Sequence, residues 1–209
     1  MGFKDTIPKA NQIKIIVTFI LVAICITLIV VFRDQLFKVN ENITDAQRFY
    51  KEYNKTGLDN VFKYVTASEA LELLKDGSSV VYFGFKDCKW CQSYAPILNE
   101  VAKENGFDTI YYCDIKKDRK DNTESYQGLV EILKDHLYDD DDGNKRIYVP
   151  DVYFINKGEI VGHNNDTSTE EGTDVEEYYS MHKEDLKNKL TELFKKVEIE
   201  TCDDSGKGC

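Results

Sequence analysis

Residues 80–91, Val-Val-Tyr-Phe-Gly-Phe-Lys-Asp-Cys-Lys-Trp-Cys, join an uninterrupted apolar run to a pair of cysteines. Residues 80–85 carry no charge, which is the pattern of a central strand buried on both faces. A helix is expected from about Cys88 to Asn105, interrupted by Pro96 and closed by Gly106. The sequence therefore predicts a buried strand, a short turn, and a helix whose first turn carries two thiols.

The same alternation of strands and helices continues on both sides of this stretch. Thr66 and Glu69 form a capping-box pattern that begins a helix before the central strand. An Asn-Lys-Gly turn at 156–158 joins two further strands into a hairpin. The order is β-α-β-α-β-α-β-β-α, which predicts an α/β fold. Outside residues 80–105, the expected strands are 61–65, 109–113, 152–155 and 159–162, and the expected helices are 66–77, 122–137 and 181–197.

The position of the two cysteines at a helix start favours redox chemistry. A thiolate is the reactive form of cysteine, and unpaired N–H groups at a helix N-terminus favour negative charge there. Cys88 lies at the exposed end and can attack a disulfide, whereas Cys91 lies one turn further in and can resolve the mixed disulfide. Lys89 favours a thiolate, while the carboxylate of Asp87 opposes it.

Two other uses of the cysteine pair compete with redox chemistry. A structural zinc site needs four ligands, but the chain has no second C-x-x-C, and its three histidines lack the usual ligand spacing. A purely structural disulfide is the other alternative, and a peroxide- or metal-handling thiol protein is a further one. The redox interpretation implies no metal and no organic cofactor, because a partner protein would supply or accept the electrons.

Residues 88–102, Cys-Lys-Trp-Cys-Gln-Ser-Tyr-Ala-Pro-Ile-Leu-Asn-Glu-Val-Ala, resemble the C-x-x-C helix of the thioredoxin superfamily. Ala95-Pro96 stands where that family carries a helix-kinking proline. Residues 148–151, Tyr-Val-Pro-Asp, resemble the segment that holds the family's cis-proline, and 154–162 resemble the hairpin that follows it. The resemblance covers about residues 58–197 and implies a thioredoxin-like fold.

The resemblance also implies roles for individual residues in a thiol–disulfide oxidoreductase. Cys88 would be the nucleophile and Cys91 the resolving thiol. Pro150, if cis, would place the Val149 backbone beside the sulfurs, where it could pair with an extended protein substrate. Trp90, within the Lys-Trp dipeptide between the cysteines, would contribute to the surface that meets substrates and redox partners.

The sequence departs from the thioredoxin pattern at two positions. Tyr82 stands where the family has a buried acid, six residues before the first cysteine, so the usual proton acceptor for Cys91 is missing. Asp87 replaces the usual tryptophan. The sequence therefore leaves open whether the pair oxidises, reduces or isomerises disulfides. A narrower similarity to membrane-anchored bacterial proteins of the bacteriocin transport accessory type adds an alternative function, a non-catalytic accessory or binding module with a structural C-x-x-C.

An apolar segment near the N-terminus predicts a membrane anchor. Residues 15–32, Ile-Ile-Val-Thr-Phe-Ile-Leu-Val-Ala-Ile-Cys-Ile-Thr-Leu-Ile-Val-Val-Phe, would span roughly 27 Å as a helix. Ile24 before Cys25 argues against signal cleavage, so we expect an uncleaved signal anchor. The short N-terminal tail favours a domain on the extracytoplasmic face of the cell membrane. The expected parts are a cytoplasmic tail 1–14, the transmembrane anchor 15–32, a linker 33–57, the domain 58–197 with an insertion at about 116–146, and a flexible tail 198–209.

The net charge of the chain and its remaining cysteines allow further predictions. Residues 39–209 carry 22 Lys+Arg against 36 Asp+Glu, and such an acidic body argues against nucleic-acid binding, which needs a cationic face. Cys202 and Cys209 lie in the polar tail, where they would form an accessory disulfide or exchange with the Cys88–Cys91 pair. Cys113 falls in a predicted strand and is expected to be a core residue.

Overall fold

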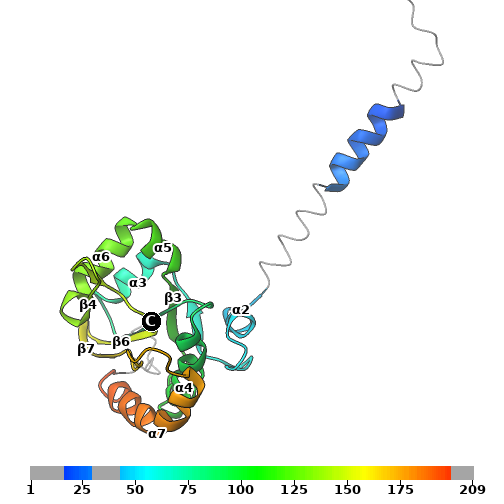
Figure 1. The fold of residues 1–209 in the computed structure, drawn as a ribbon. Helices are drawn as coiled ribbons and strands as arrows, with labels where there is room; N and C mark the ends of the chain where they lie inside the picture. Colours follow the sequence, from blue (N-terminus) through cyan, green and yellow to red (C-terminus); the bar gives the residue numbers. More distant parts are fainter. Residues whose placement is uncertain (1–16, 30–42, 199–209) are drawn as a thin grey trace, which may run out of the picture. The chain divides into compact units, whose positions relative to one another are not determined.

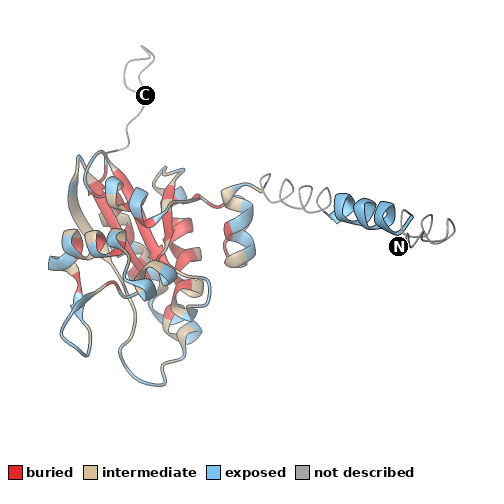
Figure 2. Cartoon of the chain, turned by 90° about the horizontal axis from the view of Figure 1, so that it is seen from above, coloured by how far each residue is buried: buried red, intermediate tan, exposed pale blue. Residues whose placement is uncertain are grey.

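The computed structural model describes residues 17–29 and 43–198. The chain divides into two units, Met1–Thr44 and Asp45–Cys209, which are considered separately. In the first unit, residues 17–29 form a helix with exposed side chains (Figure 2). No helix within the described residues is long and apolar enough to cross a membrane. Both ends of the predicted span 15–32 lie outside the described residues, as do the tail cysteines Cys202 and Cys209.

The second unit is built on a mixed five-stranded sheet in the order β1-β3-β2-β6-β7. Strands β1, β3 and β2 are parallel, whereas β6 is antiparallel to β2 and pairs with β7 in a hairpin. All six residues of β2 are buried, as the continuous apolar run predicts. The strands are β1 (Phe62–Tyr64), β2 (Ser79–Gly84), β3 (Ile110–Asp114), β6 (Asp151–Asn156) and β7 (Glu159–Asn164).

Helices cover both faces of this sheet, so β2 is enclosed between two apolar layers (Figures 1 and 2). Because strand side chains alternate between faces, Val80 and Tyr82 enter one core cluster while Val81 and Phe83 enter the other. The first cluster is packed by α2 (Asp45–Glu52), α4 (Lys89–Glu104) and α7 (Val175–Phe194), and the second by α3 (Ala67–Leu73) and α6 (Glu124–Leu133).

Local signals in the sequence account for several of these boundaries. The capping box of α3 is present with both of its hydrogen bonds, between Thr66 and Glu69. Gly106 follows α4 with a positive φ of 81°, the conformation that favours glycine after a helix. The expected interruption at Pro96 is wrong, because α4 continues through it. Proline removes one helical hydrogen bond, but its neighbours Ala95 and Ile97 are buried in the core and hold the helix in place.

The predicted linker 33–57 is too long. Helix α2 lies within it, and Phe49 and Tyr53 are completely buried. The Phe49 ring stacks on Tyr53 at 4.3 Å and on Phe62 at 3.9 Å between ring centroids. Residues from Asp45 onward therefore belong to the folded unit.

The predicted insertion at 116–146 is not peripheral. It contains α5 (Lys116–Asp121), α6, a short 3-10 helix (Lys134–His136) and a two-stranded sheet of β4 (Tyr138–Asp139) and β5 (Lys145–Arg146). Leu129 and Leu133 of α6 are fully buried and complete the second core cluster. The segment therefore covers one face of the sheet, because its helical spacing supplies a buried apolar stripe.

Candidate active site

The two cysteines of the C-x-x-C occupy different environments at the start of α4. Cys88 is the N-cap residue, and its sulfur accepts a hydrogen bond of 3.1 Å from the backbone N–H of Cys91. Cys88 is partly exposed, whereas Cys91 has no exposed surface. Both are free thiols in this structure. The first sulfur is thus accessible and the second is enclosed.

These environments shift the two thiol pKa values in opposite directions. The pKa of Cys88 is lowered, mainly because the Cys91 thiol hydrogen-bonds to it, and also by the backbone N–H groups of Cys91 and Trp90 and by the positive charge of Arg119. Burial raises the pKa of Cys91, and the adjacent Cys88 raises it further. Because the pKa of Cys88 is lowered and that of Cys91 is raised, Cys88 is the cysteine that forms the thiolate.

The charged neighbours differ from those that the sequence singles out. Neither Lys89 nor Asp87 is among the groups with the largest effects on the Cys88 pKa. Asp87 forms an ion pair with Lys116 of α5, which lowers the pKa of its carboxyl and offsets its charge. Arg119, also on α5, is the basic side chain that acts on Cys88. No sequence signal identifies Arg119, because its proximity depends on how α5 packs.

The segment before β6 lies against the first cysteine. The Val149–Pro150 peptide bond is cis, as the resemblance implies. The Cys88 thiol donates to the backbone carbonyl of Val149 at 3.7 Å. Trp90 meets the rings of Tyr178 and Tyr179 on α7 edge-on, at 5.2 and 5.6 Å. The structure therefore brings the predicted site residues together at one edge of the first core cluster, namely Cys88, Cys91, Trp90, Val149 and Pro150.

Tyr82 is fully buried in an aromatic cluster beneath the cysteines. Its hydroxyl makes no hydrogen bond of normal geometry within the described part of the chain, but it interacts weakly with the Cys91 thiol and so lowers the pKa of Cys91. Burial raises the pKa of Tyr82 well above its ordinary value, so the hydroxyl stays neutral and is not a base. Two neighbours, Tyr53 and Tyr112, instead share a buried hydroxyl–hydroxyl hydrogen bond of 3.0 Å.

A buried acid does exist near this site, on a different strand from the one the family uses. Asp151 directly follows Pro150 and is 1% exposed. The Tyr153 hydroxyl donates to its carboxylate at 2.8 Å, and His163 Nδ1 lies 3.3 Å from its other oxygen. Burial raises the pKa of Asp151 to about 6. The sequence signal for this acid is a charged residue at the start of an otherwise apolar strand.

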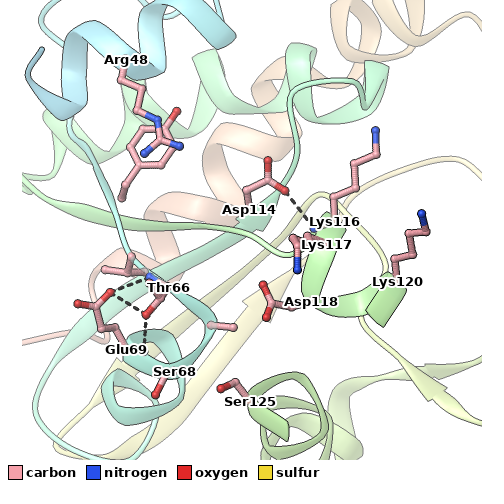
Figure 3. Close-up of a pocket in the computed structure, with 13 residues that line it drawn as sticks. Arg48, Thr66, Ser68, Glu69, Asp114, Lys116, Lys117, Asp118, Lys120 and Ser125 are labelled. Carbon is pink, nitrogen blue, oxygen red and sulfur yellow. Dashed lines mark hydrogen bonds between the residues drawn. The ribbon is translucent and has the colours of Figure 1, made fainter. Parts of the chain in front are cut away.

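A separate cavity of about 910 Å³ lies between the ends of α2, α3 and α5 (Figure 3). Its polar groups largely satisfy one another, because Glu69 completes the cap at Thr66 and Asp114 accepts the backbone N–H of Lys116. Neither cysteine of the C-x-x-C lines this cavity. Among the residues that the structure describes, no three His, Cys, Asp or Glu side chains are grouped so that they could hold a metal ion.

Comparison with solved structures finds plant thioredoxins among the similar folds. Thioredoxin O2 from Arabidopsis thaliana is 18% identical, covers 60% of this chain and 94% of its own, and has a TM-score of 0.35. Thioredoxin O1 from the same plant is 20% identical, covers 60% of this chain and 97% of its own, and has a TM-score of 0.34. The chain matches no protein family and no curated protein.

Proposed function

We propose that this protein is a thiol–disulfide oxidoreductase that acts on protein cysteines through Cys88 and Cys91. The observation that carries the proposal is the geometry of the two sulfurs at the start of one helix: the partly exposed Cys88 sulfur accepts the backbone N–H of Cys91, whose own side chain is fully enclosed. A structural disulfide gains nothing from one accessible thiolate and one enclosed thiol. An exchange reaction needs both, because attack requires a thiolate and resolution requires a second sulfur within reach.

The exchange follows from this arrangement. The Cys88 thiolate attacks one sulfur of a substrate disulfide, the substrate S–S bond breaks, and the other substrate sulfur leaves as a thiolate. Cys91 then loses its proton and attacks the Cys88 sulfur, which releases the second substrate thiol. Two electrons pass from the dithiol to the substrate, and the protein is left with a Cys88–Cys91 disulfide. The reverse sequence oxidises a substrate dithiol.

Substrate binding is assigned to the surface around Cys88. Val149, whose carbonyl contacts the Cys88 thiol, would pair with an extended substrate segment, and Pro150 would shape that segment's path. Trp90 would pack against the substrate at the rim, because it is only partly buried. A second redox protein would restore the starting state of the pair, so no organic cofactor and no metal is required.

We further propose that residues 15–32 anchor the protein in the cell membrane, with the redox domain on the extracytoplasmic face. The support is the apolar sequence of this segment. Labelling intact cells with an impermeant thiol reagent after reduction tests the orientation. Labelling of Cys88 before lysis supports it, and labelling only after lysis contradicts it.

Two cysteine variants of the full chain test the redox proposal. Wild-type protein should catalyse exchange with an insulin or peptide disulfide, and Cys88→Ser should abolish it. Cys113→Ser is the matched control, because that thiol is buried on β3 away from the pair, and it should retain the activity. If the wild type is inert and Cys88→Ser keeps full function in cells, the protein is instead the non-catalytic accessory module, for example in bacteriocin transport.

A further inference from the structure

Two arginines of the 116–146 segment are not neutralised by carboxylates. No ion pair joins Arg119 or Arg146 to an acidic side chain within the described residues, whereas Lys116, Lys117 and Lys145 of the same segment each have such a partner. Arg119 Nη1 donates to the backbone carbonyl of Ile147, the residue that follows Arg146, which brings the two arginines into one region. Burial and then the positive charge of Arg146 lower the pKa of Arg119, in agreement with that contact. The Nε atom of Arg146 is buried without a hydrogen-bond partner. Two unpaired guanidinium groups side by side repel each other, and an anion between them would relieve that repulsion.

The pair lies beside the reactive thiol. The Arg119 guanidinium is 5.1 Å from the centre of the Phe85 ring, and the backbone carbonyl of Phe85 accepts the Cys88 N–H at 3.1 Å. Arg119 Nη1 also donates to the carbonyl of Ile147 at 3.1 Å, two residues before Val149. Arg119 thus connects the segment before the C-x-x-C to the segment before Pro150, the two segments that border Cys88.

Aromatic rings hold both guanidinium groups at this edge of the site. The Arg146 guanidinium lies 5.5 Å from the centre of the Tyr148 ring, and Tyr148 is 41% exposed. Each guanidinium group therefore packs against an aromatic ring, which does not neutralise its positive charge. Some N–H groups of each arginine remain available to hydrogen-bond a ligand. This arrangement differs from Lys116, which also lies over Phe85 but is paired with Asp87.

We propose that Arg119 and Arg146 bind a carboxylate of the substrate, so that the enzyme prefers protein segments with an acidic residue next to the reacting cysteine. The proposal rests on the thiol–disulfide exchange proposed above and names the substrate class of that site. The chain as a whole is acidic, with a net charge of −11, and this charge disfavours nonspecific binding of an acidic segment. A local pair of arginines both attracts the acidic segment and fixes its register on Cys88, because guanidinium binds carboxylate in a fork geometry.

Peptide disulfides that differ in one charge test this proposal. The full chain, reduced and in detergent, reacts with a short peptide whose cysteine is linked to a neutral thiopyridine, and the part of the thiopyridine release that Cys88→Ser loses reports attack by Cys88. The cysteine is flanked by Glu in one peptide and by Gln in the other. We expect the wild type to react about fivefold faster with the Glu peptide, and this preference should fall at high salt.

Variants separate substrate binding from other roles of the arginines. Arg146→Gln should reduce the preference to less than about twofold, mainly by slowing the reaction with the Glu peptide, and Arg146→Lys should restore part of the preference. Lys120→Gln, which removes an equal charge from α5, should keep the preference. Arg119→Gln should also lower the preference for the Glu peptide. It should in addition raise the Cys88 pKa, because the positive charge that lowers this pKa is lost.

The outcomes distinguish the two proposals. Equal rates with the Glu and Gln peptides in the wild type, or an unchanged preference in Arg146→Gln, would overturn the carboxylate site while leaving the exchange activity intact. Equal slowing with both peptides in Arg119→Gln and Arg146→Gln would also overturn it, because the arginines would then act on the thiolate alone. No reaction with either peptide would contradict the exchange function itself.

Discussion

The backbone N–H of Cys91 donates a 3.1 Å hydrogen bond to the sulfur of Cys88, so the resolving residue itself stabilises the attacking thiolate. The pKa of Cys91 is instead raised, first by burial and then by the interaction of its own side chain with Cys88. The first turn of α4 therefore lowers the pKa of Cys88 and raises the pKa of Cys91. Without Cys91, the environment that favours a thiolate at Cys88 would be weaker.

The lowered pKa of Cys88 predicts the pH dependence of its alkylation. Because only the thiolate reacts, the rate should stay high as the pH falls below the ordinary range for cysteine, and should decline only as it passes the lowered pKa. Cys91→Ala should move this decline to higher pH, since the largest stabilising contact is lost. Site-resolved mass spectrometry after iodoacetamide treatment measures both. Faster alkylation of Cys91 than of Cys88 would contradict the assignment.

The ion pair between Asp87 and Lys116 predicts opposite effects of two single substitutions. Lys116→Gln leaves the Asp87 carboxylate unpaired beside the thiol and should raise the Cys88 pKa, because a nearby negative charge disfavours a thiolate. Asp87→Asn should lower it. The double variant should return it toward the wild-type value, and ultraviolet absorbance of the thiolate follows the titration. Identical pKa values in all four proteins would show that Asp87 has no influence on Cys88.

Removing the hydroxyl group from two different tyrosines of the aromatic cluster should have different effects on the stability of the protein. Tyr112→Phe leaves the buried Tyr53 hydroxyl unpaired, which should lower the free energy of unfolding by about 1–3 kcal/mol. Tyr82→Phe removes a hydroxyl that interacts only weakly with the Cys91 thiol, so it should cost less stability than Tyr112→Phe and should raise the pKa of Cys91. Urea denaturation of both variants compares them directly. A larger loss in Tyr82→Phe than in Tyr112→Phe would mean that the Tyr82 hydroxyl has a partner.

The buried carboxyl of Asp151 predicts a pH-dependent contribution to stability. Its pKa of about 6 in the folded state lies above the ordinary value of 3.8, so the folded protein holds this proton more tightly than the unfolded chain. Its contribution is therefore favourable at low pH and is lost as the pH rises through about 6. Relative to wild type, Asp151→Asn should gain up to about 3 kcal/mol between pH 4 and pH 7. Denaturation at both pH values measures this difference, and a pH-independent difference would contradict the shift.

Much of the central sheet and the thiol pair could be predicted because their signals are local. Six consecutive uncharged residues identify β2, Thr66 and Glu69 cap α3 through contacts three residues apart, and the helix N-terminus follows directly from the C-x-x-C. The antiparallel hairpin of β6 and β7 is likewise confirmed, because a short turn at residues 156–158 determines it. These features need no knowledge of distant contacts.

The remaining features depend on tertiary packing. Residues 33–57 mix charged and polar side chains without sustained apolar periodicity, which is the pattern of a linker. The importance of Phe49 in α2 appears only when its ring meets Phe62. Arg119 influences Cys88 because α5 packs beside Phe85. Arg119 and Cys88 are 31 positions apart in sequence, and no motif connects them. The buried Asp151 likewise becomes meaningful only through the contacts that Tyr153 and His163 make with it.

Trapping the mixed disulfide tests the central claim most directly. The Cys91→Ser protein, reduced and mixed with a peptide disulfide, should accumulate a covalent adduct because the resolving thiol is missing. Peptide mapping by mass spectrometry should locate that adduct on Cys88, and Cys88→Ser should form none. An adduct on another cysteine, or no adduct in Cys91→Ser under conditions where the folded protein is soluble and reduced, would contradict the assignment of Cys88 as the nucleophile.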